Sequence, residues 1–513
     1  MRNGILILDF GSQYTQLIAR KIRELRFYAE IHPYNFPVKE IKNQQPAGII
    51  LSGGPHSVYE KNAPSVNKEI FSLNIPILGI CYGLQLITHL LGGKVNSSKN
   101  REYGAALLKI QTESVFFNNI NEKTRVWMSH GDKVIKLPAG FKAIAQTDSS
   151  PYAAVINIEK KITGVQFHPE VQHTNNGKTF LKNFCISFCH LKPNWTMKNF
   201  AKEKIKEIQN QTGNERVLLG LSGGVDSTVT AKILHDAIGK RLSCVYVDNG
   251  LMRKDETEAV IKRFKNNFHI PLHVVKAEKS FLSSLKGVTD PEKKRKIIGR
   301  VFLEEFKKKA EEIGHHEYLG QGTLYTDVIE SVSVKGPSDT IKSHHNRVAE
   351  VQKLIKAGKV IEPLKELFKD EVRRLGLTLK IPRELLFRHP FPGPGLAIRI
   401  LGEITKERLN LLREADAILL DELKKTGYYK KIWQAFVVLL PVKSVGVMGD
   451  NRTYENAVAV RMVESKDGMT ADFAKVPHAI LGKISNRIIN EVSGINRVVY
   501  DISSKPPATI EWE

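Results

Sequence analysis

The chain has 513 residues, 42% of them apolar, and a formal net charge of +23. This length is too great for one hydrophobic core and predicts about three domains. No run approaches the roughly 18 consecutive apolar residues of a membrane span, and the apolar N-terminal run lacks a small-residue cleavage site. Four scattered cysteines are too few for a disulfide framework. We therefore expect a cytoplasmic protein without membrane contact.

The positive charge raises the question of nucleic-acid binding. Most of the basic residues are lysines spread along the chain, and runs such as 292–296 and 306–309 resemble solvated helix faces. A nucleic-acid groove would require these charges to gather on one face. We expect no nucleic-acid partner and interpret the charge as suited to small anionic substrates.

Cys81 occupies a sharp turn in the first 191 residues, where short apolar strands alternate with helical patterns. The turn Gly79–Gly83 follows the apolar run Ile75–Leu78 and precedes a helical pattern over 84–91. Glycines on both sides of a nucleophile at a strand-to-helix elbow expose it above the sheet edge. The following helix N-terminus should lower the pKa of the thiol. Cys81 is thus a predicted nucleophile in an open α/β sheet.

A base for this thiol is predicted at the end of another strand, in the segment Gly164–Glu170. Pro169 favours extended geometry in the residue before it, so the side chains of His168 and Glu170 should share a face. His168 would then transfer the proton and Glu170 would orient the imidazole.

Together these residues resemble class I glutamine amidotransferases, which use a Cys-His-Glu triad. The resemblance covers nearly all of residues 1–191. It implies that the loop carrying Gly53 and Gly54 and the backbone amide of Tyr82 form the oxyanion hole. It also implies that Gln85 and the segment Ser129–Asp132, which contains His130, line the glutamine pocket.

A phosphate cradle is predicted at Ser222, Gly223, Gly224, Val225, Asp226 and Ser227. This loop lies between an apolar run over 217–221 and a helical pattern over 228–235. Glycines permit close approach of the backbone, and the helix N-terminus favours an anion. The loop lacks the lysine of the commoner phosphate loop, G-x-x-x-x-G-K-[ST].

The pattern S-G-G-x-D-S resembles the PP-loop of ATP pyrophosphatases, which cleave ATP between the α and β phosphates. This resemblance implies that backbone at Val247 reads the adenine. Asp327 and Glu330 are candidates to hold Mg²⁺ against the phosphates, and Lys342 is a candidate for a lid over them. We expect Mg²⁺ to arrive with ATP, with no protein-only metal site and no organic prosthetic group.

The remaining motifs resemble the synthetase half of GMP synthetases. These motifs are Lys294–Gly299, Gly320–Ser331, Lys342–Asn346, Val360–Lys365 and Arg388–Leu396. The C-terminal tail is apolar and stiffened by prolines, which predicts a docked terminus. The resemblance implies that Arg295 and Lys505 bind the phosphate of XMP. It further implies that the tail, including Ile510 and Glu511, contacts the purine.

Over its full length the chain therefore resembles the glutamine-hydrolysing GMP synthetase family. The resemblance implies an amidotransferase α/β domain over 1–191, a parallel-sheet PP-loop domain of the adenine-nucleotide α-hydrolase type over 192–388, and an α+β dimerisation and XMP-binding domain over 389–513. Its expected activity is GMP synthesis from XMP, ATP and glutamine by a homodimer. The alternatives are another PP-loop amidotransferase or ligase, such as an NAD synthetase, and an RNA-modifying PP-loop protein.

Overall fold

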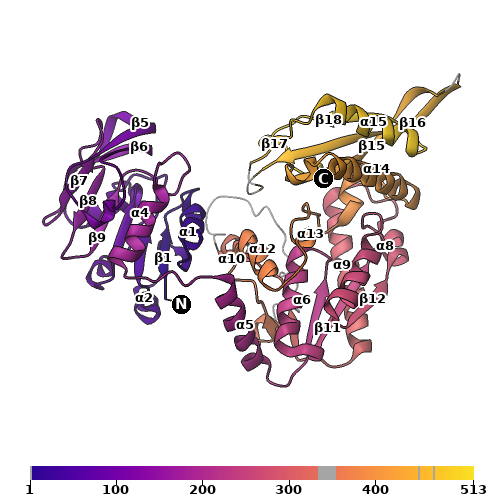
Figure 1. Cartoon of the computed structure of the whole chain (residues 1–513), viewed down its shortest axis with the longest axis horizontal. Coiled ribbons are helices and arrows are strands. Elements are labelled where there is room, and N and C mark those ends of the chain that lie inside the picture. The colour runs from indigo at the N-terminus through magenta and orange to yellow at the C-terminus, as the bar shows by residue number, and fades with distance from the viewer. Residues whose placement is uncertain (1–2, 333–353, 449–450, 466–467, 469) are drawn as a thin grey trace. The chain divides into compact units, whose positions relative to one another are not determined.

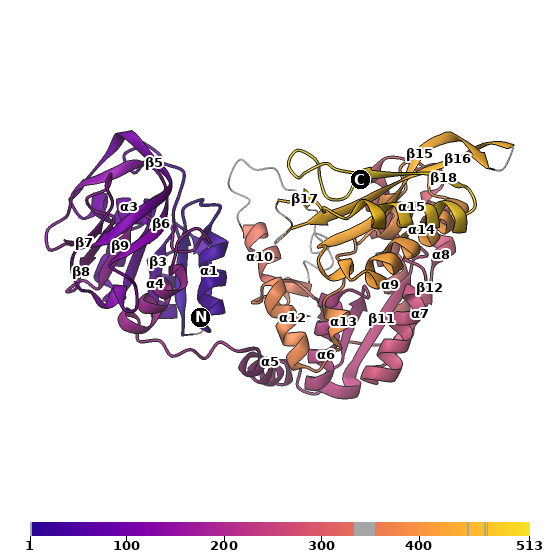
Figure 2. The same cartoon turned by 45° about the horizontal axis from the view of Figure 1, so that its top comes forward.

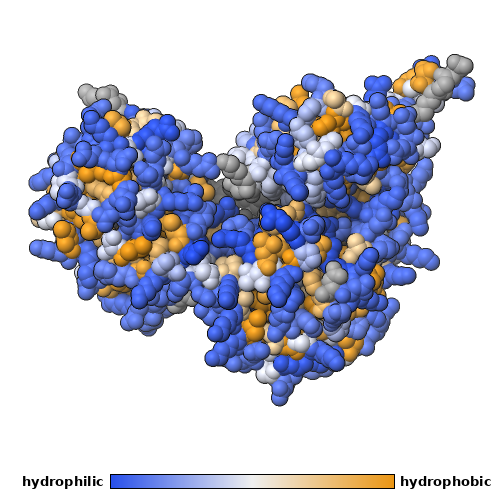
Figure 3. Space-filling view, in the orientation of Figure 1, coloured by the Kyte–Doolittle hydropathy of each residue, from blue (hydrophilic) through white to orange (hydrophobic). Residues whose placement is uncertain are grey.

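The computed structural model describes residues 3–332, 354–448, 451–465, 468 and 470–513 (Figures 1 and 2). The chain divides into two compact units. Unit 1 comprises Met1–Phe200 with Ile329–Gly336, and unit 2 comprises Ala201–Val328 with Pro337–Glu513. Hydrophilic residues cover most of the face drawn in Figure 3. Among the helices of the described ranges, none has the length and apolar character needed to cross a membrane.

Unit 1 is built on a nine-stranded sheet with the order β2-β1-β3-β4-β9-β8-β7-β5-β6. Its strands are β1 Ile5–Asp9, β2 Ala29–Pro33, β3 Gly48–Leu51, β4 Ile77–Ile80, β5 Lys94–Ile110, β6 Lys123–Lys136, β7 Lys142–Gln146, β8 Ala154–Asn157 and β9 Ile162–Val165. The strands from β2 to β9 in this order run parallel, and the other four are antiparallel. The predicted open α/β sheet is confirmed.

The burial pattern of each strand depends on whether one or both faces of the sheet are covered by other elements. Strands β3 and β4 are buried throughout, which is typical of parallel strands with helices on both faces. The helices of unit 1 are α1 Thr15–Glu24, α2 Val38–Gln44, α3 Tyr82–Leu90 and α4 Gly177–Asn183. Helices α2 and α3 contribute to a core on one face of the sheet, and α1 packs with α4. β6 instead alternates buried and more exposed residues, as an antiparallel strand with one wet face does.

Unit 2 contains a five-stranded parallel sheet with the order β12-β11-β10-β13-β14. Its strands are β10 Val217–Leu221, β11 Leu242–Asp248, β12 Leu272–Lys276, β13 Tyr318–Gly320 and β14 Val360–Ile361. The associated helices are α6 Val225–Ile238, α7 Glu256–Lys262, α8 Glu278–Leu285, α9 Pro291–Ile313, α12 Lys369–Thr378 and α13 Arg383–Leu386, together with α5 Met197–Thr212 and α10 Tyr325–Val332, which both cross a boundary between the units. The predicted parallel-sheet PP-loop fold is confirmed.

The C-terminal part of unit 2 is a four-stranded sheet with helices α14 Lys406–Lys425 and α15 His478–Glu491. Its strands are β15 Gln434–Met448, β16 Asn451–Glu464, β17 Asp472–Phe473 and β18 Ile495–Asp501. β15 and β16 form a long antiparallel pair, and β18 pairs with β16 in parallel. Helix α14 packs on β15 and on α15, so this part has the predicted α+β architecture.

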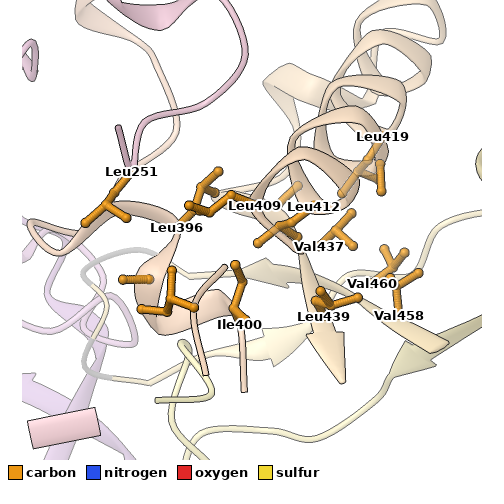
Figure 4. Close-up of a cluster of buried hydrophobic side chains, with 14 of the residues drawn as sticks. Leu251, Leu396, Ile400, Leu409, Leu412, Leu419, Val437, Leu439, Val458 and Val460 are labelled. Atoms are coloured by element: carbon orange, nitrogen blue, oxygen red, sulfur yellow. The ribbon is translucent and has the colours of Figure 1, made fainter. Parts of the chain in front are cut away.

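One hydrophobic core joins the two sheets of unit 2. It includes Val245 of β11, Leu396 and Ile400 of the connecting segment, Leu412 of α14 and Val437 of β15, and each of these five side chains is fully buried. Figure 4 shows side chains of this core, among them Leu409, Leu412 and Leu419 of α14. This shared core accounts for the placement of both sheets in one compact unit, and the predicted boundary after residue 388 stays a prediction.

We expect Leu412→Ala to weaken both sheets of unit 2, because it empties part of the core that they share. A buried Leu→Ala change costs about 2–5 kcal/mol of unfolding free energy. Hydrogen exchange measured by mass spectrometry should show reduced protection in β11 as well as in β15, with β3 of unit 1 unchanged. Leu377→Ala on α12 is the control, since Leu377 is 39% exposed. Loss of protection confined to α14 and β15 would argue for separate cores.

Candidate active sites

Cys81 lies at the junction of β4 and α3, where the backbone adopts an unusual conformation. Its φ is 51° and ψ is −105°, in a region that non-glycine residues rarely occupy. A Cβ on Gly83 would lie 2.3 Å from the carbonyl oxygen of Leu51, so strand and helix can approach this closely only with glycine there. The predicted strand–elbow–helix geometry is confirmed, and the thiol lies at the N-terminus of α3.

The structure brings His168 and Glu170 together beside Cys81. Nδ1 of His168 donates to Oε1 of Glu170 at 2.7 Å, and the Cys81 thiol is near enough to act on the charge of the imidazole. All three residues are buried, with 5%, 3% and 1% of Cys81, His168 and Glu170 exposed. Gln166 was not predicted, and its Nε2 lies 3.7 Å from the Cys81 sulfur. Gln166 stands two positions before His168, and this alternation was a usable signal.

The surroundings of His168 favour its charged form. Burial by itself disfavours an imidazolium, but the carboxylate of Glu170 and the Cys81 thiol together raise the pKa of His168 well above its usual range. The arrangement therefore stabilises an imidazolium at His168, next to the sulfur of Cys81.

The loop that carries Gly53 and Gly54 lies against this histidine. A Cβ on Gly53 would be 3.1 Å from Cε1 of His168, and one on Gly54 would be 2.8 Å from the carbonyl oxygen of Phe10. A side chain at Gly53 or Gly54 would therefore force the imidazole or the loop to move. Tyr82 is the first residue of α3, so its backbone amide belongs to the free amides of the helix start.

Gln85 and His130 converge on Asp132. Nε2 of Gln85 and Nδ1 of His130 each donate to the main-chain oxygen of Asp132 at 2.9 Å. Nε2 of His130 lies 3.2 Å from Oε2 of Glu102, a partner that comes from β5 and was not predicted. Cys81 is close to the same segment, because its sulfur lies 3.7 Å from the carbonyl oxygen of Ser129. The structure thus places the predicted glutamine-binding residues on the Cys81 side of the sheet.

The segment Ser222–Ser227 forms the predicted turn between β10 and α6. Gly223 has φ of 73°, and a Cβ there would lie 2.9 Å from a methyl carbon of Val260. The hydroxyls of Ser222 and Ser227 lie 3.1 Å apart, and the hydroxyl of Thr228 donates to the carbonyl oxygen of Gly224. Gly224 precedes the first residue of α6, Val225, so the loop presents the free amides of a helix start to solvent.

Two basic residues that were not assigned a role contact this loop. Nζ of Lys369 lies 2.6 Å from each carboxylate oxygen of Asp226. Arg388 donates to the carbonyl oxygen of Gly223 at 3.3 Å and to both carboxylate oxygens of Glu256 at 2.6 Å. Lys369 is 143 positions from Asp226 in sequence, so nothing local indicated the pair. Arg388 opens the glycine- and proline-rich motif that the sequence singled out.

The other predicted nucleotide residues have mixed surroundings. Val247 lies in β11 and is 4% exposed. Oδ2 of Asp327 accepts from the amide of Leu324 and caps the start of α10. The side chain of Glu330 and all of Lys342 lie outside the described residues. Within the described residues, no cluster of three His, Cys, Asp or Glu side chains could hold a metal ion.

The C-terminal tail is docked, as predicted. The buried guanidinium of Arg461 donates to the carbonyl oxygens of Ser503 and Thr509. Ile510 is 8% exposed and belongs to a small core with Phe436 and Val438 of β15. The tail is thus held by hydrogen bonds and by apolar contact.

Glu511 and Lys505 have definite partners within unit 2. Glu511 receives hydrogen bonds from Nε and Nη2 of the fully buried Arg399, at 3.1 and 2.8 Å, and from Gln434 at 2.7 Å. Nζ of Lys505 donates to the carbonyl oxygen of Gly468 at 2.8 Å. Arg399 and Gln434 were not predicted, since neither lies near the tail in sequence.

The last residue, Glu513, contacts α9. Its carboxylate lies 2.5 Å from Nζ of the fully buried Lys294, and its carbonyl oxygen accepts from Nη2 of Arg295 at 2.6 Å. Arg295 also pairs with Glu292, and its side chain is 31% exposed. The structure therefore brings the predicted residue Arg295 to the same tail as Lys505 and Glu511.

Comparison with known proteins gives matches along the whole chain. The family described as glutamine amidotransferase class-I matches residues 6–188, the PP-loop domain matches 197–306, and the GMP synthase C terminal domain matches 421–512. Curated proteins named GMP synthase [glutamine-hydrolyzing] align with the chain end to end. The Nitratiruptor sp. protein is 59% identical, with 99% of each chain covered. The proteins of Brachyspira hyodysenteriae and Aquifex aeolicus are 56% and 57% identical, with 100% of each chain covered.

Fold and sites thus define a class I glutamine amidotransferase joined to a PP-loop ATP pyrophosphatase. The chain belongs to the family of glutamine-hydrolysing GMP synthases. It is a ligase that makes GMP from XMP, with glutamine as the nitrogen donor and ATP as the activating substrate.

We expect Glu170→Gln to shift the pH dependence of glutamine hydrolysis. The imidazolium of His168 is present below its raised pKa and is lost as pH rises through it, and Glu170 is one cause of that raised pKa. Removing the carboxylate lowers the pKa, so the alkaline limb of kcat/KM should move to lower pH. Glutaminase assays between about pH 6 and about pH 9 would measure this limb.

The ammonia-dependent reaction of the same Glu170→Gln variant is the control, and its pH profile should match that of the wild type. An alkaline limb that stays in place or moves to higher pH would contradict the assignment of Glu170 as a partner of the imidazolium.

Proposed function

We propose that Cys81, His168 and Glu170 carry out the hydrolysis of glutamine in unit 1. The observation that carries this proposal is the buried Glu170–His168 hydrogen bond of 2.7 Å beside the Cys81 thiol. The thiolate attacks the carboxamide carbon, and His168 gives its proton to the leaving nitrogen as the C–N bond breaks. Water then hydrolyses the thioester, which yields glutamate and restores the thiol.

The oxyanion of the tetrahedral intermediate would be bound by backbone amides of the loop Gly53–Gly54 and of Tyr82. Donors fixed before the reaction stabilise the developing charge without reorganisation. Gln85 and the segment that contains His130 would form the pocket for the amino-acid end of glutamine. The carboxylate of Asp132 suits the α-ammonium group, since an ammonium needs an acidic partner when it leaves water.

In unit 2, the loop Ser222–Ser227 would hold the phosphates of ATP, and backbone at Val247 would contact the adenine. The free amides at the start of α6 and the serine hydroxyls are donors suited to phosphate oxygens. Mg²⁺ would arrive with ATP and be held chiefly by phosphate oxygens and water, with Asp327 and Glu330 as the candidate protein ligands. When bound, this ion would offset the charge of the leaving pyrophosphate.

XMP would bind at the tail, with Arg295 and Lys505 at its phosphate and Ile510 and Glu511 at its purine. The C2 oxygen of XMP attacks the α-phosphorus of ATP and pyrophosphate leaves, and ammonia then displaces AMP from C2 to give GMP.

Glu511 has one acceptor position left for the purine. Two hydrogen bonds already end on its Oε1 and one on its Oε2. Because a carboxylate has about four acceptor positions, one remains for the purine. Lys342 would act as the lid residue over the phosphates of ATP.

We further propose three domains with boundaries after residues 191 and 388, and a cytoplasmic location. The protein would act as a homodimer through the C-terminal sheet. Exposed apolar side chains gather on β15, β16 and β18, and Figure 3 shows hydrophobic atoms near the far end of the β15–β16 hairpin at upper right. They are Val442, Val445, Val447, Tyr454 and Val499, between 42% and 76% exposed. Such a patch on a soluble enzyme marks an association surface.

We expect Cys81→Ala to abolish GMP formation with glutamine while ammonium salts still support it. The substitution removes the thiol but leaves the PP-loop of unit 2 untouched. GMP, AMP and pyrophosphate should be measured with XMP, ATP and either nitrogen source. Ser227→Ala is the matched variant in the other site, and it should lower the reaction with both nitrogen sources by tenfold or more. Loss of the ammonia-dependent reaction in Cys81→Ala would contradict the proposed division of labour.

We expect Val447→Glu to convert the homodimer into monomers, because it places a charge in the proposed contact surface. Val447 is 76% exposed, so its replacement should not disturb the fold. Sedimentation velocity at several protein concentrations would measure the change. Ile158→Glu in unit 1 is the control, since Ile158 is 77% exposed and lies outside the C-terminal sheet. A wild-type protein that is monomeric throughout, or an unchanged dimer in Val447→Glu, would overturn the proposal.

A further inference from the structure

Tyr59 makes a long-range contact that the reaction described above does not use. Its hydroxyl donates to Oδ1 of Asp132 at 2.9 Å, across 73 positions of sequence. Tyr59 belongs to the loop that also carries Gly53 and Gly54, whereas Asp132 belongs to β6. One hydrogen bond therefore connects the loop of the proposed oxyanion hole with the segment of the proposed glutamine pocket.

The loop directs Tyr59 toward this partner. The side chain of Val58 is 6% exposed and packs in the main core of unit 1. The amide of Glu60 donates to the carbonyl oxygen of Ser57 at 3.0 Å, which closes a turn around Val58 and Tyr59. With Val58 anchored inside, the next side chain points outward, and Tyr59 is 49% exposed. The turn and the buried Val58 therefore fix the direction of the Tyr59 side chain, although Tyr59 is half-exposed.

Asp132 is tethered in two different ways. Its main chain is fixed because its carbonyl oxygen accepts hydrogen bonds from Gln85 and His130. Its carboxylate, which is attached to that main chain by rotatable bonds, is held by the hydroxyl of Tyr59. Asp132 is 9% exposed, so a shift of the carboxylate would change the wall of the pocket rather than only a surface group.

We propose that Tyr59 is a positioning residue that orients the carboxylate of Asp132 toward the α-ammonium group of glutamine. The inference rests on the proposed function, in which Asp132 lines the glutamine pocket. Tyr59 touches neither Cys81 nor the scissile amide in this scheme, so it acts on substrate binding and on recognition of the amino-acid end. It also ties the far end of the Gly53–Gly54 loop to the substrate-binding wall.

The test is Tyr59→Phe, which removes one hydroxyl and keeps the ring. The KM for glutamine should rise about three- to tenfold, the cost of one hydrogen bond to a charged group at a half-exposed site, while kcat changes less than about twofold. GMP formation from ammonia should be unchanged. Two readouts separate positioning from general damage. In an Asp132→Asn background, Tyr59→Phe should raise the KM for glutamine by less than about a further 1.5-fold, because the Tyr59–Asp132 pair is already broken.

The second readout uses 4-carbamoylbutanoate, which is glutamine without its α-ammonium group. Hydrolysis of this compound should be equally slow in the wild type and in Tyr59→Phe, because the group that Asp132 would bind is missing. His56→Gln is the control on the same loop: its side chain is 49% exposed, pairs with Glu60 and should leave KM unchanged. An unchanged KM in Tyr59→Phe, an additive effect in Asp132→Asn, or an equal penalty with 4-carbamoylbutanoate would overturn the inference. If Cys81→Ala still used glutamine, the proposed function itself would fail instead.

Discussion

Leu396 and Ile400 join the same buried core as Val245 of the PP-loop sheet and Val437 of the C-terminal sheet. This apolar contact determines where the segment after Arg388 can lie. The amide of Leu396 donates to the carbonyl oxygen of Leu251, and Arg388 at the other end of the motif donates to Gly223. Because one segment is fixed in the core and bonded to the PP-loop, the nucleotide cradle and the C-terminal sheet of unit 2 keep a defined geometry.

The C-terminal tail depends on that core through three buried cations. Arg399, Arg461 and Lys294 have fully buried side chains, and all three find partners in the tail. A charge removed from water without a partner costs several kcal/mol, and breaking a buried pair from one side costs about 3–5 kcal/mol. Burial lowers the pKa of Lys294 although Glu513 opposes the shift. The tail is therefore part of the folded unit, and its docking follows from the need to compensate these charges.

The sequence alone predicted the features that depend on neighbours in the chain. The elbow at Cys81, the turn at Ser222–Ser227 and the face shared by His168 and Glu170 each follow from strand, glycine and helix patterns. The pairs Lys369–Asp226 and Arg399–Glu511 were not predicted, since their partners are 143 and 112 positions apart. Long-range pairing of charges depends on how the layers pack, and no local pattern in one sequence reports it. Asp132 was predicted within the glutamine-pocket segment, but its pairing with Tyr59, 73 positions away, belongs to this second group.

Both sites are built on the same strand–turn–helix arrangement, and they differ in the group that lies at the helix start. In both units a buried parallel strand runs into a helix start, and a positive φ at Cys81 or Gly223 turns the chain so that the helix amides face outward. In unit 1 the group at the helix start is the protein's own thiol, and His168, whose pKa is raised well above its usual range, lies beside it. In unit 2 the proposed cradle would accept the anion of a ligand, and the loop's own carboxylate, Asp226, would repel phosphate if it were unpaired. The ammonium of Lys369 lies 2.6 Å from that carboxylate and offsets part of the repulsion, so a phosphate at the proposed cradle would meet a paired carboxylate rather than an isolated anion.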